Sequence, residues 1–317
     1  MIGGEQVRRA LGAEIERTLR DVPYDVARTA LYSGAELFDA FNPDDPSSRD
    51  RCLDAVVARH LAATGGDKPP MPEMLARRLH DLHVRQAALS FLAKFPRKRV
   101  VGIMGGHALS RCDPCYQRAV LLAKALTEKG FLMVSGGGPG AMEATHLGAW
   151  LAGRPVSDVT VALCRLPDVP AEDPRWLASA FDTMDRFPQS EPRYSLAIPT
   201  WHYGNEPPTP FATHIAKLFD NSIREDTLLS ESRGGLVFMP GGPGTVQEAV
   251  DVAAKNHYGA AEDATRLVFM DRVFWTGTVP LHPFFERLAA TGRYRNLELH
   301  LEDDAEAVVR LLSRTGV

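Results

Sequence analysis

Residues 236–248 read LVFMPGGPGTVQE, and this stretch decides the expected fold. Its opening apolar run is typical of a buried strand, and the glycines after it indicate a tight turn into a helix. Glycines let the backbone approach a ligand closely, and the N–H groups at a helix start attract anions. Thr245 adds a hydroxyl to the turn, and Glu248 follows one helical turn later. The stretch therefore predicts a phosphate cradle beside a candidate catalytic acid.

A second stretch of the same kind lies upstream. Residues 131–144 read FLMVSGGGPGAMEA, an apolar strand followed by glycines and a helix start. Two such loops at the carboxyl ends of parallel strands would form the two halves of one nucleotide-sized pocket. The glycines could instead serve only as tight strand-to-helix turns. The presence of two loops with well-placed charged residues favours a phosphorylated ligand.

Neither loop has the spacing of the commonest nucleotide motifs. Neither ends in Gly-Lys-Ser or Gly-Lys-Thr, so a P-loop is disfavoured. Glu143 and Gln247 stand where a Gly-x-Gly-x-x-Gly motif has its third glycine. We find no convincing acidic residue at the end of a following strand to bind an NAD ribose. A nicotinamide dehydrogenase is therefore disfavoured as well.

Three segments share their pattern with one known family. Residues 240–248 read Pro-Gly-Gly-x-Gly-Thr-x-x-Glu, residues 135–143 form the other glycine loop, and residues 101–106 form a strand and turn. Together they resemble the LOG family of phosphoribohydrolases, over residues 97–275 and into the C-terminus. Members of this family cleave the N-glycosidic bond of a nucleoside 5′-monophosphate and release the free base and ribose 5-phosphate. The chain length and the segment 167–210 resemble the larger bacterial nucleotide nucleosidases more than the compact cytokinin-activating members.

The resemblance implies a catalytic pair, Arg224 and Glu248. The family's glutamate is the last residue of the signature, and its arginine lies on a helix just before the signature strand. This chain departs from plant-type members, which follow the arginine with lysine, because Glu225 stands there. The spacing from arginine to signature is also slightly longer. These departures bear on the base that is preferred more than on the reaction.

The chemistry of N-glycosidic cleavage needs these residue types. Breaking the bond between C1′ and the base builds oxocarbenium character, which a carboxylate can stabilise or relieve by deprotonating water. A guanidinium can stabilise the leaving base electrostatically. The alternative readings are a surface ion pair of Arg224 with Glu225 or Asp226, and a helix-start acid favoured by the macrodipole at Glu248.

The remaining site residues follow from the loops and their neighbours. We expect the phosphate and ribose to be bound by Gly105, Gly106, Gly137, Gly138, Gly241, Gly242, Gly244 and Thr245. Weaker candidates for the base are Asn221, Glu143 and His202. Arg186, Arg193 and Tyr194 are further candidates to reach a phosphate or base. The chemistry requires no metal and no organic cofactor.

Composition narrows the possible partners. The chain has 317 residues and a net charge of −4, with both signs mixed and no basic face, so nucleic acid is not expected. No apolar run reaches the ~18–20 residues of a membrane helix, and the N-terminus has no signal pattern. Cys112 and Cys115 form a lone C-x-x-C, for which reduced thiols are expected, not a zinc or redox site. We expect a cytoplasmic protein away from membranes, with a nucleotide as its ligand. The family resemblance implies a homodimer or higher homo-oligomer.

The predicted organisation is an α/β fold: a Rossmann-like parallel sheet flanked by helices on both faces, with a helical N-terminal extension. We assign residues 1–95 to the extension and 96–317 to the catalytic domain. Expected helices of the extension are 5–20, 24–41, 49–63 and 73–95. Expected strands are 100–104, 132–135, 159–164, 235–239, 266–270 and 297–300. Expected helices between them are 116–129, 141–151, 211–229, 245–255, 281–290 and 304–313, and 167–210 is expected to form a lid or insert.

Two other functions remain open at this point. One is a non-catalytic nucleotide or molybdenum-cofactor carrier of the same fold. The other is a structural protein built around residues 1–95. A carrier has no need of Arg224 and Glu248 together, so the presence of both favours the hydrolase over a carrier. A structural protein would instead show stability and assembly that do not depend on nucleotides.

Overall fold

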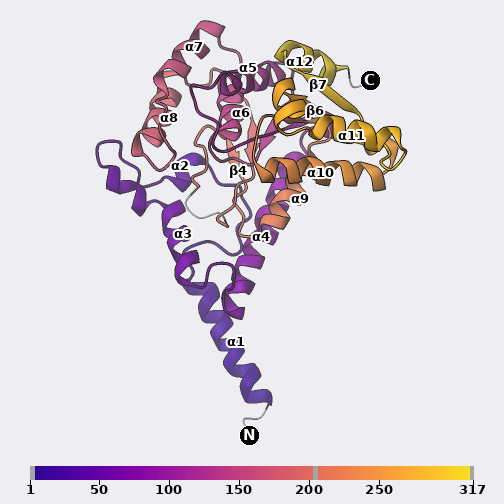
Figure 1. The fold of residues 1–317 in the computed structure, drawn as a ribbon. Coiled ribbons are helices and arrows are strands. Elements are labelled where there is room, and N and C mark those ends of the chain that lie inside the picture. Colours follow the sequence, from indigo (N-terminus) through magenta and orange to yellow (C-terminus); the bar gives the residue numbers. More distant parts are fainter. Residues whose placement is uncertain (1–3, 203–205, 315–317) are drawn as a thin grey trace.

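A seven-stranded sheet lies at the centre of the molecule, in a computed structural model that describes residues 4–202 and 206–314 (Figure 1). All of its strand pairs are parallel, in the order β4-β3-β2-β1-β5-β6-β7. The strands are β1 (Val100–Met104), β2 (Leu132–Ser135), β3 (Ser195–Ala197), β4 (His214–Ile215), β5 (Gly235–Phe238), β6 (Leu267–Met270) and β7 (Leu299–Glu302). The predicted fold class is confirmed.

The strand order reverses between β1 and β5. Chain order runs outward from β1 to β4 on one side and from β5 to β7 on the other. Met104 pairs with Phe238, so the two strands end at the same level. In open parallel sheets a ligand crevice forms at such a reversal, outside the carboxyl ends of the strands. Both the turn at 105–106 and the turn at 239–244 start there.

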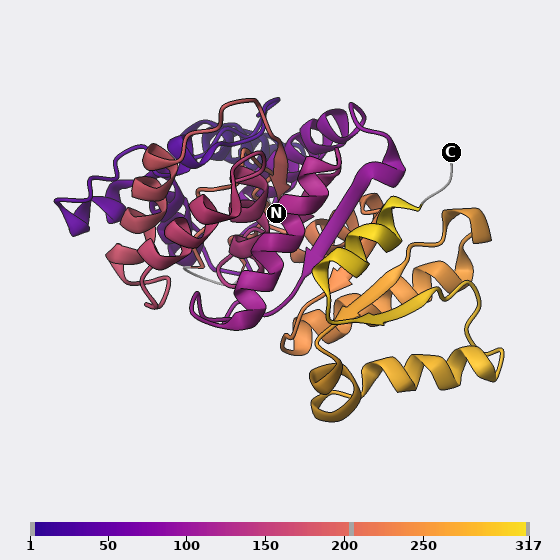
Figure 2. The same ribbon diagram turned by 90° about the horizontal axis from the view of Figure 1, so that it is seen from above.

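Helices cover both faces of the sheet because strand side chains alternate. In β1, Val101 and Ile103 belong to one core cluster, and Val100 and Met104 to the other. The first cluster is covered by α5 (Pro114–Glu128), α6 (Ala141–Trp150), α7 (Val156–Arg165) and α12 (Ala305–Ser313). The second is covered by α4 (Met71–Leu92), α9 (Asn221–Glu231), α10 (Pro243–Tyr258) and α11 (Leu281–Ala290). Seen from above, the C-terminal helices and strands lie together at one end of the molecule (Figure 2).

The N-terminal region joins the sheet's own core. It contains α1 (Gly4–Asp21), α2 (Gly34–Leu37), α3 (Leu53–Ala63) and α4, and α1 leads away from the body beside α4 (Figure 1). Tyr32 exchanges backbone hydrogen bonds with Ile215 at 2.8 Å in both directions, which covers the edge strand β4. Tyr24, Tyr32 and Leu37 lie in the same cluster as the α4 side of the sheet. The division into two domains at residue 95 stays a prediction.

Two predicted elements are wrong, and a third begins later in the chain than predicted. The segment 24–41, expected to be a helix, is helical only over Gly34–Leu37. Its apolar side chains pack into the core from an irregular backbone, and its Tyr32 pairs with the edge strand β4. The expected strand 159–164 is part of α7, whose buried Val159 and Ala162 are three residues apart while Val161 is 45% exposed. The expected helix 211–229 begins only at Asn221, where the Asp220 side chain accepts hydrogen bonds from Ser222 N and Ile223 N. Residues 211–220 contain β4 instead.

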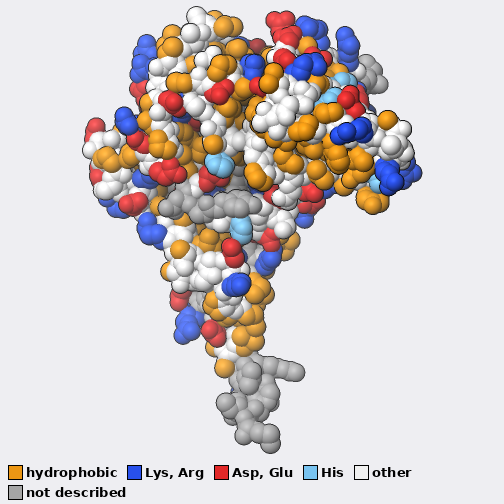
Figure 3. All heavy atoms as spheres, in the orientation of Figure 1, with side chains coloured by type: hydrophobic (Ala, Val, Ile, Leu, Met, Phe, Trp, Pro, Cys, Tyr) orange, Lys and Arg blue, Asp and Glu red, His pale blue; other side chains and the backbone are white. Residues whose placement is uncertain are grey.

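The segment 167–210 is more regular than expected. It contains α8 (Pro174–Arg186) and the interior strand β3, so it is part of the fold as well as a neighbour of the cavity described below. No helix in the described ranges is long and apolar enough to cross a lipid bilayer. Acidic and basic side chains are interspersed on the face that Figure 3 shows.

Candidate functional site

Three glycine-containing turns meet at the carboxyl ends of β1, β2 and β5. Gly106 N donates to Pro240 O at 3.0 Å, and Ala141 N donates to Gly106 O at 3.2 Å. A Cβ on Gly105 would lie 2.6 Å from Ala141 Cβ, closer than real carbon atoms approach. Gly140 has φ +69 and packs directly against the backbone of Gly106. The glycines are therefore required first for the close packing of the three turns.

The two predicted phosphate loops differ in their exposure to solvent. Residues 136–140 are all buried, and Gly137, at φ +76, packs against Ala197 while its carbonyl accepts from Thr209 N at 2.8 Å. Residues 242–244 are exposed, and a Cβ on Gly242 or Gly244 would meet nothing within 4 Å. The sequence pattern does not predict which loop is exposed to solvent, because this depends on residues far along the chain.

The start of α10 is the more open of the two predicted phosphate sites. Its N-cap is Gly242, and no side chain caps it. The first N–H groups of a helix have no partner within the helix and carry a partial positive charge. The Thr245 side chain is buried, and its hydroxyl lies against Gly241. Glycines 241, 242 and 244 and Thr245 thus form the loop that best fits the predicted phosphate cradle.

Arg224 and Glu248 come together beside these loops. Arg224 projects from α9 and Glu248 from α10, and Arg224 Nη1 lies 3.7 Å from Glu248 Oε1. Both residues are buried, at 9% and 8% exposure. Arg224 Nε donates to Ile198 O at 3.0 Å, and its guanidinium lies so close to Gly136 that a Cβ there would collide with it. The pair that the sequence resemblance implies is thus one geometric unit.

Burial sets the protonation of Glu248. Desolvation raises the pKa of its carboxyl to about 7, while Arg224 opposes this shift and Glu225 and Asp251 add to it. A carboxyl with such a pKa can give or accept a proton near neutral pH. Perturbed carboxyls of this kind in clefts are candidates for catalysis.

The N-terminal region fixes the helix that carries Arg224. The fully buried Asp81 of α4 accepts hydrogen bonds from Phe219 N at 2.9 Å and Asp220 N at 2.8 Å. Asp220 caps α9 and forms an ion pair with Arg78. Sequence reasoning missed Asp81, because a single aspartate within a helical pattern carries no local signal.

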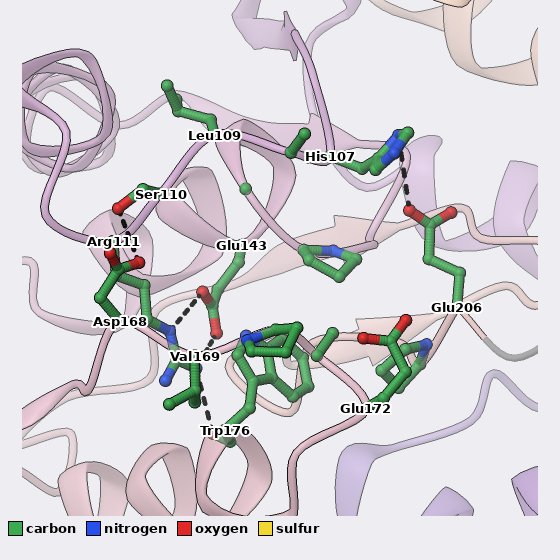
Figure 4. A pocket seen from close by; sticks show the side chains of 16 residues that line it. His107, Leu109, Ser110, Arg111, Glu143, Asp168, Val169, Glu172, Trp176 and Glu206 are labelled. Atoms are coloured by element: carbon green, nitrogen blue, oxygen red, sulfur yellow. Dashed lines mark hydrogen bonds and ion pairs between the residues drawn. The ribbon is translucent and has the colours of Figure 1, made fainter.

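A cavity of about 440 Å³ lies on the other side of the buried glycine loop (Figure 4). Residues 107–111, 139–140, 168–172 and 206–207 line most of it. Gly136 contacts Arg224, whereas a Cβ on Gly138 would lie 3.1 Å from Glu206 Cδ, so the loop separates the Arg224–Glu248 pair from this cavity. His107 Nδ1 and Glu206 Oε1 face one another at 3.9 Å across its mouth. Acidic and histidine side chains also border a hollow on the face in Figure 3.

Glu143 lines this cavity, but its carboxylate is already hydrogen-bonded to other side chains of the protein. Its carboxylate accepts from Arg111 Nε at 3.0 Å, Arg111 Nη2 at 2.6 Å and the Tyr116 hydroxyl at 2.9 Å, and the residue is fully buried. Figure 4 shows Arg111 and Glu143 pointing at one another. Arg111 also donates to Ser179 Oγ and Trp176 O. We therefore interpret Glu143 as a structural residue that joins α6 to the loop after β1 and to α8, and not as a base contact.

The other two weak base candidates lie elsewhere. His202 and Asn221 line a separate cavity of about 620 Å³ between the N-terminal region and α9. His202 Nδ1 lies 3.0 Å from Asp67 Oδ1, and Asn221 Nδ2 donates to Glu225 Oε1 at 2.7 Å. Asn221 is thus linked to Arg224 through Glu225, whereas His202 and Glu143 border different cavities.

The candidates from segment 167–210 do not line either of these cavities. Arg193 pairs with Glu191 at 3.1 Å, and Tyr194 packs edge-on against Phe91. Arg186 lies over the ring of Phe187. Arg193 thus forms a surface ion pair, and Tyr194 and Arg186 pack against neighbouring aromatic rings.

The lone C-x-x-C does not resemble a reactive site. Cys112 is exposed and Cys115 is buried, and burial raises the pKa of the Cys115 thiol to about 11. A reactive thiolate needs a lowered pKa. Within the described residues, no group of three or more His, Cys, Asp or Glu side chains is arranged to hold a metal ion.

Comparisons with known proteins add little to this geometry. No family model matches the chain, and none of the curated proteins matches its sequence. Among solved structures, the chain is similar to the molybdenum cofactor carrier protein of Chlamydomonas reinhardtii, with 16% sequence identity and a TM-score of 0.42. That match covers 68% of this chain and 96% of the carrier protein. A likeness this distant says nothing about the ligand or the activity of the present chain.

Proposed function

We propose that this chain hydrolyses nucleoside 5′-monophosphates to the free base and ribose 5-phosphate. The observation that carries the proposal is the buried Arg224–Glu248 pair, 3.7 Å apart, beside the open start of α10. The LOG-like signature in residues 240–248 supports it.

The 5′-phosphate would bind at the start of α10. Exposed glycines and uncapped backbone N–H groups there suit an anion. Glu248 follows about 7 Å further along the helix axis, a length on the scale of a ribose phosphate. A phosphate held at the helix start would therefore place the sugar over the Glu248 carboxyl, and the remote anchor would hold C1′ in position for attack.

Arg224 and Glu248 would then act on the bond between C1′ and the base. Glu248 offers a negative charge or a proton to the reacting centre, and Arg224 offers a fixed positive charge against the electrons that move onto the base. Burial strengthens both effects, because the surrounding protein screens charges less than water does. The acceptor of the ribosyl group is water, so no cofactor enters the balance.

Product formation tests the proposal. Purified protein is incubated with AMP, GMP, IMP, CMP, UMP and N6-isopentenyl AMP, and free base and ribose 5-phosphate are measured by chromatography. Adenosine is the matched control, since it lacks the 5′-phosphate that anchors the substrate. Adenine should be released from adenosine far more slowly than from AMP. Binding of nucleotides with no release of any base would contradict the hydrolase and indicate a nucleotide-binding protein instead.

A further inference from the structure

Glu225 places a second carboxylate at the Arg224 guanidinium. Arg224 Nη1 lies 3.9 Å from Glu225 Oε1 and 3.7 Å from Glu248 Oε1. The side chains of Glu225 and Glu248 are 14% and 10% exposed, so water screens both only partly. One cation is therefore shared between two acids, at distances longer than a hydrogen bond.

The two carboxylates are not held equally. Glu225 Oε1 accepts from Asn221 Nδ2 at 2.7 Å, and Glu225 Oε2 accepts from Gln247 Nε2 at 3.1 Å. These two hydrogen bonds hold the Glu225 carboxylate in place beside Arg224. Across residues 4–202 and 206–314, no hydrogen bond to the Glu248 carboxyl is found. Glu225 is thus the more firmly held of the two acids.

The charges that face Glu248 point the same way. Arg224 and Glu225 face it from α9, and Asp251 acts on it from its own helix α10. A carboxyl keeps its proton to higher pH when a second carboxylate competes with it for the same cation. This agrees with the raised pKa of Glu248, for which burial is the largest cause.

We propose that Glu225 competes with Glu248 for Arg224, which helps to keep Glu248 protonated, and that Glu248 acts as the general acid for the leaving base. This inference rests on the proposed hydrolase function. As the bond between C1′ and the base breaks, its electron pair goes to the base, and a nitrogen of the base takes the proton from Glu248. Water then adds to the C1′ cation and loses a proton to the Glu248 carboxylate. Water is the only co-reactant, and Glu248 ends in its starting state. Glu225 is a positioning residue, since it acts through Glu248 and Arg224.

Titration of Glu248 tests this inference without any substrate. The protein is labelled with ¹³C at the glutamate side-chain carboxyls, and the Glu248 signal is assigned by its absence in Glu248→Gln. We expect Glu225→Gln to lower the Glu248 midpoint by about one to two pH units, and Glu225→Lys to lower it further. Glu231→Gln is the matched control on the same helix, about 9 Å further along the axis, and should leave the midpoint unchanged.

A variant that changes no charge provides a second test in case the Glu225 variants do not fold. Gln247→Leu removes one of the two donors that hold Glu225, so it should lower the Glu248 midpoint by a smaller amount. Thermal unfolding is recorded for every variant. An unchanged Glu248 midpoint in the folded Glu225 and Gln247 variants would overturn the inference.

The pH profile of turnover separates this inference from the proposed function. Hydrolysis that needs protonated Glu248 loses kcat/KM as pH rises through the Glu248 midpoint, and Glu225→Gln should shift that limb to lower pH while KM stays unchanged. If turnover occurs but neither the limb nor the titration moves, the role of Glu225 is wrong and the hydrolase stands. If the titration moves but no nucleotide is cleaved, the hydrolase and its general acid are wrong, while the electrostatic coupling stands.

Discussion

Replacing Glu248 by glutamine should stabilise the protein in a pH-dependent way. In the folded chain the pKa of this carboxyl is about 7, against an ordinary value of 4.5. Below the ordinary value both folded and unfolded states hold the proton, so the carboxyl has no effect on stability. As pH rises towards 7, the unfolded state releases the proton and the folded state keeps it, so the wild-type protein loses stability. Above the folded pKa the loss is complete.

The magnitude follows from the two pKa values. A difference between 4.5 and about 7, at about 1.4 kcal/mol for each pH unit, corresponds to ~3 kcal/mol. Glutamine has nearly the same shape and cannot ionise, and no hydrogen bond to the Glu248 carboxyl is found among the described residues. We therefore expect the advantage of Glu248→Gln over wild type to grow by about 3 kcal/mol between pH 4 and pH 8.

Urea unfolding at closely spaced pH values measures this difference. The midpoint and slope are recorded for wild type, Glu248→Gln and the control Glu231→Gln, which should follow the wild-type profile. A difference between Glu248→Gln and wild type that stays constant from pH 4 to pH 8 would refute the reasoning. It would mean that Glu248 titrates in the folded protein as it does in the unfolded chain.

Three further predictions follow from single contacts. Gly136→Ala should lower kcat about a hundredfold, because the new methyl group would collide with Arg224 Nη2 and Met142 Sδ and displace the buried guanidinium; an unchanged kcat would contradict this. Asp81→Asn should lower the free energy of unfolding, measured in urea, by about 1–3 kcal/mol, since one of the two backbone N–H groups that Asp81 accepts from loses its acceptor. Glu143→Gln should lower that free energy by about 3–5 kcal/mol by leaving Arg111 buried without its counter-charge. Weaker nucleotide binding by Glu143→Gln at unchanged stability would instead make Glu143 a ligand contact.

The sequence predicts the centre of the sheet well. Strands β1, β2, β5 and β6 are short apolar runs, and those of β1, β2 and β5 lead into glycine turns, so their pattern is local. Strands β3 and β4 have three and two residues and exist through pairing with β2 and with Tyr32. Such short strands carry no periodic signal. The error at α7 has a similar cause, because its apolar residues fit both periods over so short a segment.

In the candidate site, too, the residues within the motif are predicted from the sequence, whereas contacts between distant segments are not. The positions of Arg224 and Glu248 follow from a helix before the signature strand and a helix after it, so the motif brings them to the same end of the sheet. The contact of Asp81 with Phe219 joins residues 138 positions apart, and no local pattern encodes it. The commitment of Glu143 to Arg111 likewise depends on how the loop after β1 folds over α6.

The most direct test of the central claim is the release of base by the Glu248 variant. Initial rates are measured on the best nucleoside 5′-monophosphate for wild type, Glu248→Gln and Glu231→Gln, with nucleotide binding followed in parallel. The account predicts that Glu248→Gln still binds the nucleotide but loses about a thousandfold or more in kcat, equivalent to ~4 kcal/mol, while Glu231→Gln keeps the wild-type rate. Release of base at the wild-type rate by Glu248→Gln would contradict the account.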